Sequence, residues 1–496
     1  MESDKSFIDV EDEKLNNNCD IVNENLTEEA AIPAWKACIN RFLHLKIELT
    51  ILMVFLCNSL IDAVSTDLIL TSTCVTTFNF PSNSCSNDMP DSVKNIVQPY
   101  ASKVIMAKTL IDALFPSVIS LFIGPWMDIH GRKPFLILPL IGYFISYLFW
   151  LGLSYKNSLS PFYYLIPSIP SSVTGGLVAI QACSFSYLAD TVAVQMRALR
   201  MSILALFMGL GTTFGYLIVN AYSSSHKDQL ALYIFGTATG ITLLNALYTT
   251  FVIKETVQNN QENEASIGQK IRSFFNVHHI KESLKVLVTK KPNHGRPLVL
   301  LLVPVIVFSI IIEQGEAPYF LLITKKVFSW TLEDYNSFRS SMVLIGVLIG
   351  APLIFVLKRL IKVTDLTLLF IITTMQLVSS IILSLANATA MLYVGKALGV
   401  FVDFIKAAAK TKMSYIVLAS DIGKVFVVVS MMEAIAPLIA TPIYAAVYSS
   451  VLAYKPMALF YLSFGFAVII IISLIIIKIV ELKYGIIEKR TNPTDN

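Results

Sequence analysis

The sequence predicts an all-α membrane protein with twelve transmembrane helices arranged as two six-helix bundles. Three observations support this fold class. The 496-residue chain is 55% hydrophobic and only 15% charged, whereas average globular usage is about 25% charged. The apolar residues gather in runs of about 20, the length that crosses a bilayer as a helix. A long basic segment at 254–297 divides these runs into two sets of six, which predicts two parallel halves.

The apolar runs define the predicted spans in order. They cover residues 47–71, 100–123, 135–154, 161–189, 201–222, 230–253, 298–321, 337–357, 365–386, 391–414, 425–449 and 456–479. An even number of spans puts both termini on one side. Placing the termini in the cytosol puts most loop Lys and Arg on the inner side, as the positive-inside rule requires.

The same spans set the predicted domain boundaries. These are a cytosolic disordered tail at 1–45, a first bundle at 46–253, a cytosolic linker at 254–297, a second bundle at 298–480 and a cytosolic tail at 481–496. The first tail is predicted to be disordered because its opening residues are polar and acidic.

The first predicted outer loop, residues 72–99, contains Cys74 and Cys85, which are the only cysteines in outer loops on this topology. An oxidising exterior or lumen would favour their pairing, and two free thiols are the alternative. Asn387 begins an Asn-Ala-Thr sequon in another predicted outer loop and is therefore a candidate glycosylation site.

The turn between spans 2 and 3 reads GPWMDIHGRKP. Gly124 and Gly131 allow close backbone approach or a positive φ, while Asp128 and Arg132 supply opposite charges. The spacing resembles the loop between helices 2 and 3 of the major facilitator superfamily. There the acid and the base act as a latch that holds the inner ends of the two halves together. An ordinary basic turn is the alternative interpretation.

The inner end of span 4 carries Asp190, followed by Arg197. These residues could join Asp128 and Arg132 in one cytosolic gate. They could equally belong to a plain basic loop on the inner side.

Charged residues within predicted spans cost about 2.5 to 3.5 kcal/mol each to insert, so each needs a reason. Lys108 and Asp112 in span 2 are four residues apart and can pair. In span 10, Asp403, Lys406 and Lys410 share one helical stripe that must face a polar cavity or other charges. If Asp403 neutralises Lys406, Lys410 is left for an anionic substrate. The alternative is a structural ion pair and a lysine that reaches the inner surface.

Glutamates in spans 7 and 11 are the candidates for proton coupling. Glu313 and Glu316 flank Gly315, with Pro318 close behind, which predicts unwound backbone at this point. A desolvated carboxylate in such a setting can take up a proton near neutral pH. Glu433 in span 11 belongs to the same class. The alternative for Glu316 is that it merely caps the outer end of its span.

The sequence contains no phosphate-cradling glycine loop, zinc-ligand spacing or nucleophile elbow. It also lacks the interleaved basic and aromatic pattern of a nucleic-acid groove. We therefore expect neither an enzyme nor a nucleic-acid partner, and no cofactor beyond a proton gradient as the driving force.

The turn at 124–134 and the segment ASDIGKVFVVVSMMEAIAPLIATPIYAAVY at 419–448 resemble solute carrier family 46, which includes proton-coupled folate transporters. The resemblance implies a symporter of bulky organic anions, such as folates or related conjugates. By position, Asp128 and Arg132 match the latch pair, and Lys410 falls at a functional arginine of span 10.

The chain also departs from this family. The span 5 glutamate linked to proton coupling falls at Ala205, and the span 7 histidine has no clear counterpart. The family disulfide joins the first outer loop to the loop after span 7, but residues 324–337 contain no cysteine. A local bridge between Cys74 and Cys85 is therefore favoured.

We expect secondary active transport of an organic anion by alternating access, in the plasma membrane or an endosomal or lysosomal membrane. A non-transporting receptor or sensor on the same fold is one alternative, and a uniporter of a neutral solute is another. The expected partners are the small-molecule substrate and the lipid bilayer. We expect a monomer, with a homo-oligomer as the alternative.

Overall fold

The structure is a computed structural model. It describes residues 45–85, 89–155, 159–192, 194–225, 229–256, 295–416 and 419–484. Nearly all of the described residues belong to one compact unit, Thr50–Asn496, and the account below concerns that unit and the start of its first helix. The predicted first tail, the end of the chain and most of the predicted linker lie outside the described residues, so the domain boundaries stay predictions.

The described chain is helical throughout, which confirms the predicted all-α class. The first half contains α3 (Lys46–Ser72), α4 (Asp91–His130), α5 (Lys133–Ser154), α6 (Ser168–Val173), α7 (Gly176–Thr191), α8 (Val194–Ser225) and α9 (Leu230–Val252). The second half contains α12 (Gly295–Val327), α13 (Leu332–Ile345), α14 (Ala351–Arg359), α15 (Asp365–Ser384), α16 (Thr389–Gly399), α17 (Asp403–Ile416), α18 (Ala419–Val451) and α19 (Leu459–Tyr484).

Ten helical stretches of the described residues are long and apolar enough to cross a membrane. The other two predicted spans, 100–123 and 391–414, fall on α4 and on α16 with α17. Those helices carry several of the charges described below.

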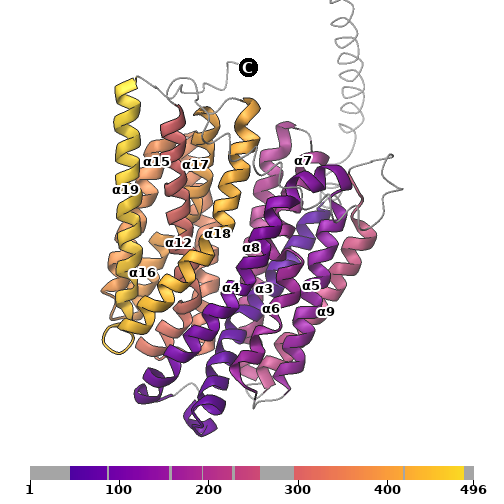
Figure 1. Cartoon of the computed structure of the whole chain (residues 1–496), viewed down its shortest axis with the longest axis vertical. Helices are drawn as coiled ribbons and strands as arrows, with labels where there is room; N and C mark the ends of the chain where they lie inside the picture. Colours follow the sequence, from indigo (N-terminus) through magenta and orange to yellow (C-terminus); the bar gives the residue numbers. More distant parts are fainter. Residues whose placement is uncertain are drawn as a thin grey trace, which may run out of the picture. The chain divides into compact units, whose positions relative to one another are not determined.

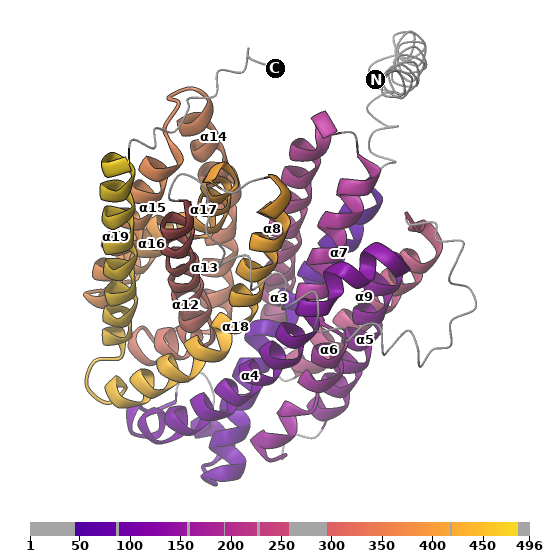
Figure 2. The same cartoon turned by 45° about the horizontal axis from the view of Figure 1, so that its top comes forward.

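The helices form two bundles, one from each half of the chain (Figure 1). The indigo and magenta helices gather on one side, and the orange and yellow helices gather on the other. Across the interface α4 packs along α18, and α8 packs along α13. The pairing of α4 with α18 is visible in both ribbon views (Figure 2).

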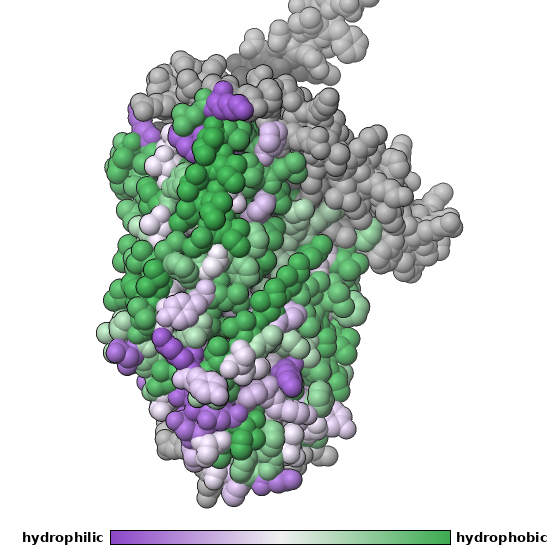
Figure 3. Space-filling view, turned by 60° about the vertical axis from the view of Figure 1, so that its left-hand side comes forward, coloured by the Kyte–Doolittle hydropathy of each residue, from purple (hydrophilic) through white to green (hydrophobic). Residues whose placement is uncertain are grey.

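The surface of the bundles is largely apolar. Figure 3 shows a broad hydrophobic face on which the hydrophilic side chains gather mainly toward the two ends. Elsewhere on the bundles, large side chains such as Phe251, Leu348 and Leu244 are more than half exposed. Contiguous exposed apolar surface of this extent fits contact with lipid rather than with water.

Two spans differ from their predicted form. The predicted span 161–189 is broken between α6 and α7, where Gly175 and Gly176 have φ of +98° and +55°. The predicted unwinding of span 7 is wrong, because α12 runs without a break through Gly315 and Pro318. Gly315 has a packing role instead, since an added Cβ there would lie 2.3 Å from the Tyr444 ring.

The bundles have two distinct ends, which α4 connects over its 40 residues. A disulfide joins Cys74 to Cys85 at one end, and we call this the disulfide end. Arg132 follows α4 at the other, which we call the latch end.

Several polar contacts join the two halves at the disulfide end. They are the ion pairs Asp67–Lys325 and Asp91–Lys326, the hydrogen bonds from Gln98 to the Leu322 carbonyl and from Tyr448 to Gln98, and the hydrogen bond from Asn220 to Ser337. The halves are therefore closed against each other at this end.

Candidate functional site

Lysines of α17 bind carboxylates of neighbouring helices. Lys406 Nζ lies 2.8 Å from Glu313 Oε2 on α12, and Lys410 Nζ lies 2.7 Å from Glu433 Oε1 on α18. The two lysines are four residues apart and therefore share one face of α17. The site thus gathers two ion pairs from three helices of the second bundle.

The side chains of both ion pairs are partly exposed, each between 23% and 32%. Charged groups that face hydrocarbon are costly and rare, so partly exposed intramembrane charges normally face the bundle interior or water. Their partial exposure therefore suits side chains that face the bundle interior or water rather than hydrocarbon.

The structure corrects one part of the prediction for span 10. Lys410 is not left open for a substrate, because it binds Glu433, whereas the predicted Asp403–Lys406 pair stays a prediction. The backbone of Asp403 begins α17, and its carboxylate lies outside the described side chains. Sequence spacing shows which charges share one helix, but it does not show which charges a neighbouring helix brings to them.

A third pair, Lys396–Glu316, lies in a more closed setting. The Glu316 side chain is only 6% exposed, and the Ser463 hydroxyl donates a 2.5 Å hydrogen bond to it. The Lys396 ammonium lies over the rings of Phe320 and Phe460, 4.8 and 5.5 Å from their centroids. Both charges have close partners on more than one side. This pair is therefore suited to a structural role rather than to exchanging a proton or a ligand.

The first bundle contributes the predicted pair of α4. Lys108 Nζ lies 3.0 Å from Asp112 Oδ2, and the Ser172 hydroxyl donates to the other Asp112 oxygen at 3.5 Å. Ser172 reaches this position on α6, just before the break at Gly175. The broken span thus places a hydroxyl beside the charges of α4.

Sequence reasoning missed another polar contact between the bundles. Tyr216 on α8 donates a 3.1 Å hydrogen bond to Asp62 on α3. The same phenol oxygen accepts from Arg339 on α13 at 3.3 Å, and the guanidinium lies 5.6 Å from the ring centroid. The predicted span 337–357 placed Arg339 at a membrane edge, and the start of α13 at Leu332 moves it one turn further into the helix.

The latch end contains an ion pair between predicted gate residues. Arg132 Nε lies 3.0 Å from Asp190 Oδ2. Gly131 has φ +101°, which favours glycine. The Arg132 and Lys133 backbone amides both donate to the Glu255 carboxylate, at 2.8 and 3.0 Å. Glu255 therefore caps the first turn of α5, where a helix N-terminus attracts negative charge.

Glu255 was missed by the sequence analysis, although an acid directly after span 6 in an otherwise basic segment was a usable signal.

The remaining predicted gate residues either make a different contact or have side chains outside the described ones. Arg197 donates to the Val192 carbonyl instead of a carboxylate. Gly124 and Asp128 lie in α4, and the Asp128 carboxylate is outside the described side chains.

The remaining candidate is the predicted glycosylation site. Asn387 is exposed in the connection between α15 and α16, which suits a glycosylation site. Among the described residues, no group of three or more His, Cys, Asp or Glu side chains could hold a metal ion.

Comparison with known proteins agrees with this architecture. The family model described as Major Facilitator Superfamily matches residues 102–441. The chain is 23% identical over 403 residues to the probable peptidoglycan muropeptide transporter SLC46 of Drosophila melanogaster, covering 78% of this chain and 76% of that protein. It is 22% identical over 373 residues to the proton-coupled folate transporter of Bos taurus, covering 75% and 77%.

A solved structure shares the fold. The human organic anion transporter MFSD10 (TETRAN) superposes with a TM-score of 0.59 at 14% identity, over 86% of this chain and 97% of that one. These similar proteins are transporters rather than enzymes, in keeping with the prediction that this chain is not an enzyme.

Proposed function

The chain belongs to the Major Facilitator Superfamily, and on that basis we propose that this multi-pass membrane transporter is a proton-coupled symporter of an organic anion. It works by alternating access, in which the two bundles expose a shared site first to one side and then to the other. The observation that carries the proposal is the pair of partly exposed lysine–glutamate contacts, Lys406–Glu313 and Lys410–Glu433.

The paired charges explain how a proton and an anion would be coupled. While Glu433 is ionised, it occupies Lys410, and an incoming anion must compete with it. A proton on Glu433 removes that negative charge and leaves Lys410 for the substrate anion. Proton and anion therefore favour each other's binding, which is the differential affinity that symport requires.

Glu313 and Glu433 are the preferred proton acceptors among the three acids. Glu316 is nearly buried, and both Lys396 and Ser463 bind it. Protonating it would leave the Lys396 charge uncompensated inside the bundle, which is costly. We assign Glu316 to holding α12, α16 and α19 together.

The names of two similar proteins support this choice of substrate class. One similar protein is named a muropeptide transporter and another a proton-coupled folate transporter. Folates and cell-wall peptides both carry carboxylates, the group that a lysine would bind. We propose a substrate of this chemical class, with the choice among its members open to the test below.

The latch end is proposed to face the cytosol, together with both termini. In this orientation the Arg132–Asp190 pair and Glu255 fix the inner end of the first bundle. The plasma membrane and the endosomal or lysosomal membrane are both compatible with an acidic outer compartment that drives the proton inward.

Uptake in proteoliposomes tests the proposal. The assay measures a panel of radiolabelled organic anions, with and without an acidic outside medium. We expect inward proton gradients to raise uptake of at least one anion several-fold. Glu433→Gln should leave uptake nearly independent of outside pH, and Lys410→Glu should reduce uptake strongly. Lys478→Met, which removes an exposed lysine of α19, is the matched control and should behave as the wild type.

Three other results would contradict the proposal. Anion uptake that ignores the gradient would remove the proton coupling. Substrate binding without uptake would favour a receptor or sensor. Uptake of a neutral solute that survives Lys410→Glu unchanged would favour a uniporter.

A further inference from the structure

A cavity of about 400 Å³ lies at the disulfide end, apart from the lysine–glutamate pairs of α17. Both halves line it, with Asp67, Lys94, Gln98 and Leu230 from the first and Lys325 and Glu333 from the second. The volume falls within the range of small-molecule sites, about 300 to 1,000 Å³. A ligand here would touch both bundles where they close against each other.

The charged side chains that the structure describes in the lining are balanced in sign. Lys94 and Lys325 are nearly buried, with side-chain exposures of 7% and 10%, and Asp67 and Glu333 supply two carboxylates. Lys325 binds Asp67 across the interface between the halves. Nearby, Asp91 lies 3.9 Å from Lys94 but binds Lys326 more closely, at 3.0 Å.

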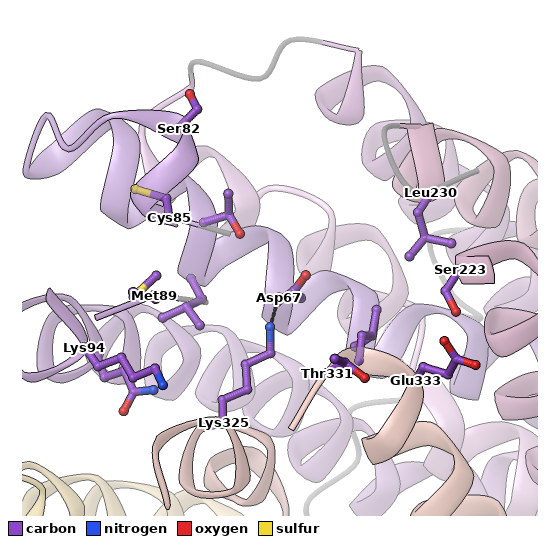
Figure 4. A pocket seen from close by; sticks show the side chains of 14 residues that line it. Asp67, Ser82, Cys85, Met89, Lys94, Ser223, Leu230, Lys325, Thr331 and Glu333 are labelled. Carbon is purple, nitrogen blue, oxygen red and sulfur yellow. Dashed lines mark hydrogen bonds and ion pairs between the residues drawn. The ribbon is translucent and has the colours of Figure 1, made fainter. Parts of the chain in front are cut away.

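The charges are also separated in space. In Figure 4 the Asp67–Lys325 pair lies in the middle of the cavity, with Lys94 on one side and Glu333 on the other. One end of the cavity is therefore cationic and the opposite end is anionic. Because Glu333 is exposed, the anionic end also meets the surrounding solvent.

We propose that this cavity is an entry site for a zwitterionic solute that carries both an amino group and a carboxylate. The carboxylate points toward Lys94 and Lys325, and the ammonium group points toward Glu333 and Asp67. Such a solute offers each member of the Asp67–Lys325 pair a replacement partner. Binding can then loosen the contact that joins α3 to α12 without leaving a buried charge unpaired.

A solute of a single charge fits this cavity less well. An anion alone would gain the two lysines but would be repelled by Asp67 and Glu333, and a cation alone would meet the reverse problem. Low exposure of the lysines strengthens both the attraction and the repulsion, because water screens them less. The role as an entry site rests on the proposed transport function, and it adds an amino group to a substrate whose carboxylates keep its net charge negative.

Protection of a cysteine placed in the cavity tests this proposal without measuring transport. Leu230→Cys introduces a partly buried thiol in the lining, and an impermeant maleimide labels it from outside intact cells. The unsubstituted chain gives the background, since its described free cysteines, Cys57 and Cys183, are buried. The probes at equal millimolar concentration are alanyl-alanine, its N-acetyl derivative and its methyl ester.

We expect alanyl-alanine to slow labelling several-fold and both blocked derivatives to have little effect. Adding Lys94→Met or Glu333→Gln to Leu230→Cys should abolish the slowing. Lys103→Met, which removes an exposed lysine of α4 outside the lining, is the control and should retain it.

Three results would overturn the inference. They are an absence of slowing by alanyl-alanine, equal slowing by the N-acetyl derivative, and slowing that survives both charge substitutions. Proton-driven anion uptake is measured in parallel for each variant. Normal uptake without protection would reject the entry site alone, whereas protection without uptake would reject the proposed symport alone.

Discussion

At the scale of single residues, three glutamates that look alike in the sequence occupy different surroundings. Glu313 and Glu433 each bind one lysine and are partly exposed. Glu316 lies only one turn from Glu313, yet it is nearly buried between Lys396 and Ser463. The residue type predicted one role for all three. The difference in burial supports the proposal that Glu313 and Glu433 exchange protons and that Glu316 has a structural role.

This division predicts a stability effect at Lys396. Lys396→Met leaves the buried Glu316 carboxylate without its cation, and breaking a buried pair from one side costs about 3 to 5 kcal/mol. We expect a clear fall in the thermal unfolding temperature of the detergent-purified protein. The double variant Lys396→Met with Glu316→Gln should recover most of the loss, and Lys478→Met should cause none. Equal stability of the single and double variants would contradict a stabilising pair.

A second prediction concerns pH and the Asp91–Lys326 pair, which precedes the predicted span 100–123. The hydrogen bond from Lys326 lowers the pKa of the Asp91 carboxyl below its ordinary value of 3.8, and desolvation opposes this only in part. For a lowered carboxyl pKa, the stabilising contribution is present above the ordinary value and is lost only as pH falls through the lowered one.

The Asp91–Lys326 pair should therefore stay intact from neutral pH down to the pH of acidic compartments. The effect of Asp91→Asn on the unfolding temperature should be the same in mildly acidic and neutral buffer. A difference that disappears in the acidic buffer would show that this pair acts as a pH sensor.

At the scale of helices, composition and span length predicted where most elements begin and end. The breaks inside spans were harder to predict, because glycine and proline have several uses in a membrane helix. Gly175 and Gly176 break a span by adopting positive φ, whereas Gly315 makes room for Tyr444 in an unbroken one. Which of these two uses a glycine has depends on the helix that packs against it. A single sequence does not reveal which helix that is.

Gly131 provides a test at this scale. Its φ of +101° and ψ of 162° suit glycine alone, and an added Cβ would lie 2.5 Å from the Glu255 carboxylate. Gly131→Ala should therefore cost about 1 to 3 kcal/mol of stability and displace Glu255 from the start of α5. Gly152→Ala in α5 is the matched control, since a Cβ there meets no atom within 4 Å. Unfolding temperatures compare the two, and equal values would contradict the strained turn.

At the scale of the whole molecule, the two-bundle architecture could be predicted because it depends on the number and spacing of apolar runs. The candidate site could be predicted only in part. Lys406, Lys410 and the glutamates stood out as charges in apolar surroundings, but their partners depend on how separate helices meet. Arg339 was missed because the sequence placed it at a membrane edge, where a cation needs no special explanation.

The contact between Asn220 and Ser337 allows alternating access itself to be tested. These side chains lie 2.8 Å apart on α8 and α13, at the end where the halves are closed. Asn220→Cys with Ser337→Cys should form a disulfide that prevents the bundles from separating there. We expect uptake to fall strongly under oxidation and to return after dithiothreitol, with each single variant unaffected. Normal uptake by the fully cross-linked protein would show that transport needs no opening at this end.

The lysine–glutamate pairs of α17 also bear on the electrical properties of the carrier. In the empty protein, Lys406 and Lys410 each move together with a carboxylate of the same bundle, so these two pairs carry no net charge. When one proton and one monovalent anion are bound, the total is unchanged. Moving one elementary charge through a membrane potential is worth about 2.3 kcal/mol per 100 mV. Neither the loaded nor the empty carrier moves net charge through the membrane potential at these positions. The turnover rate should therefore be nearly independent of the membrane voltage.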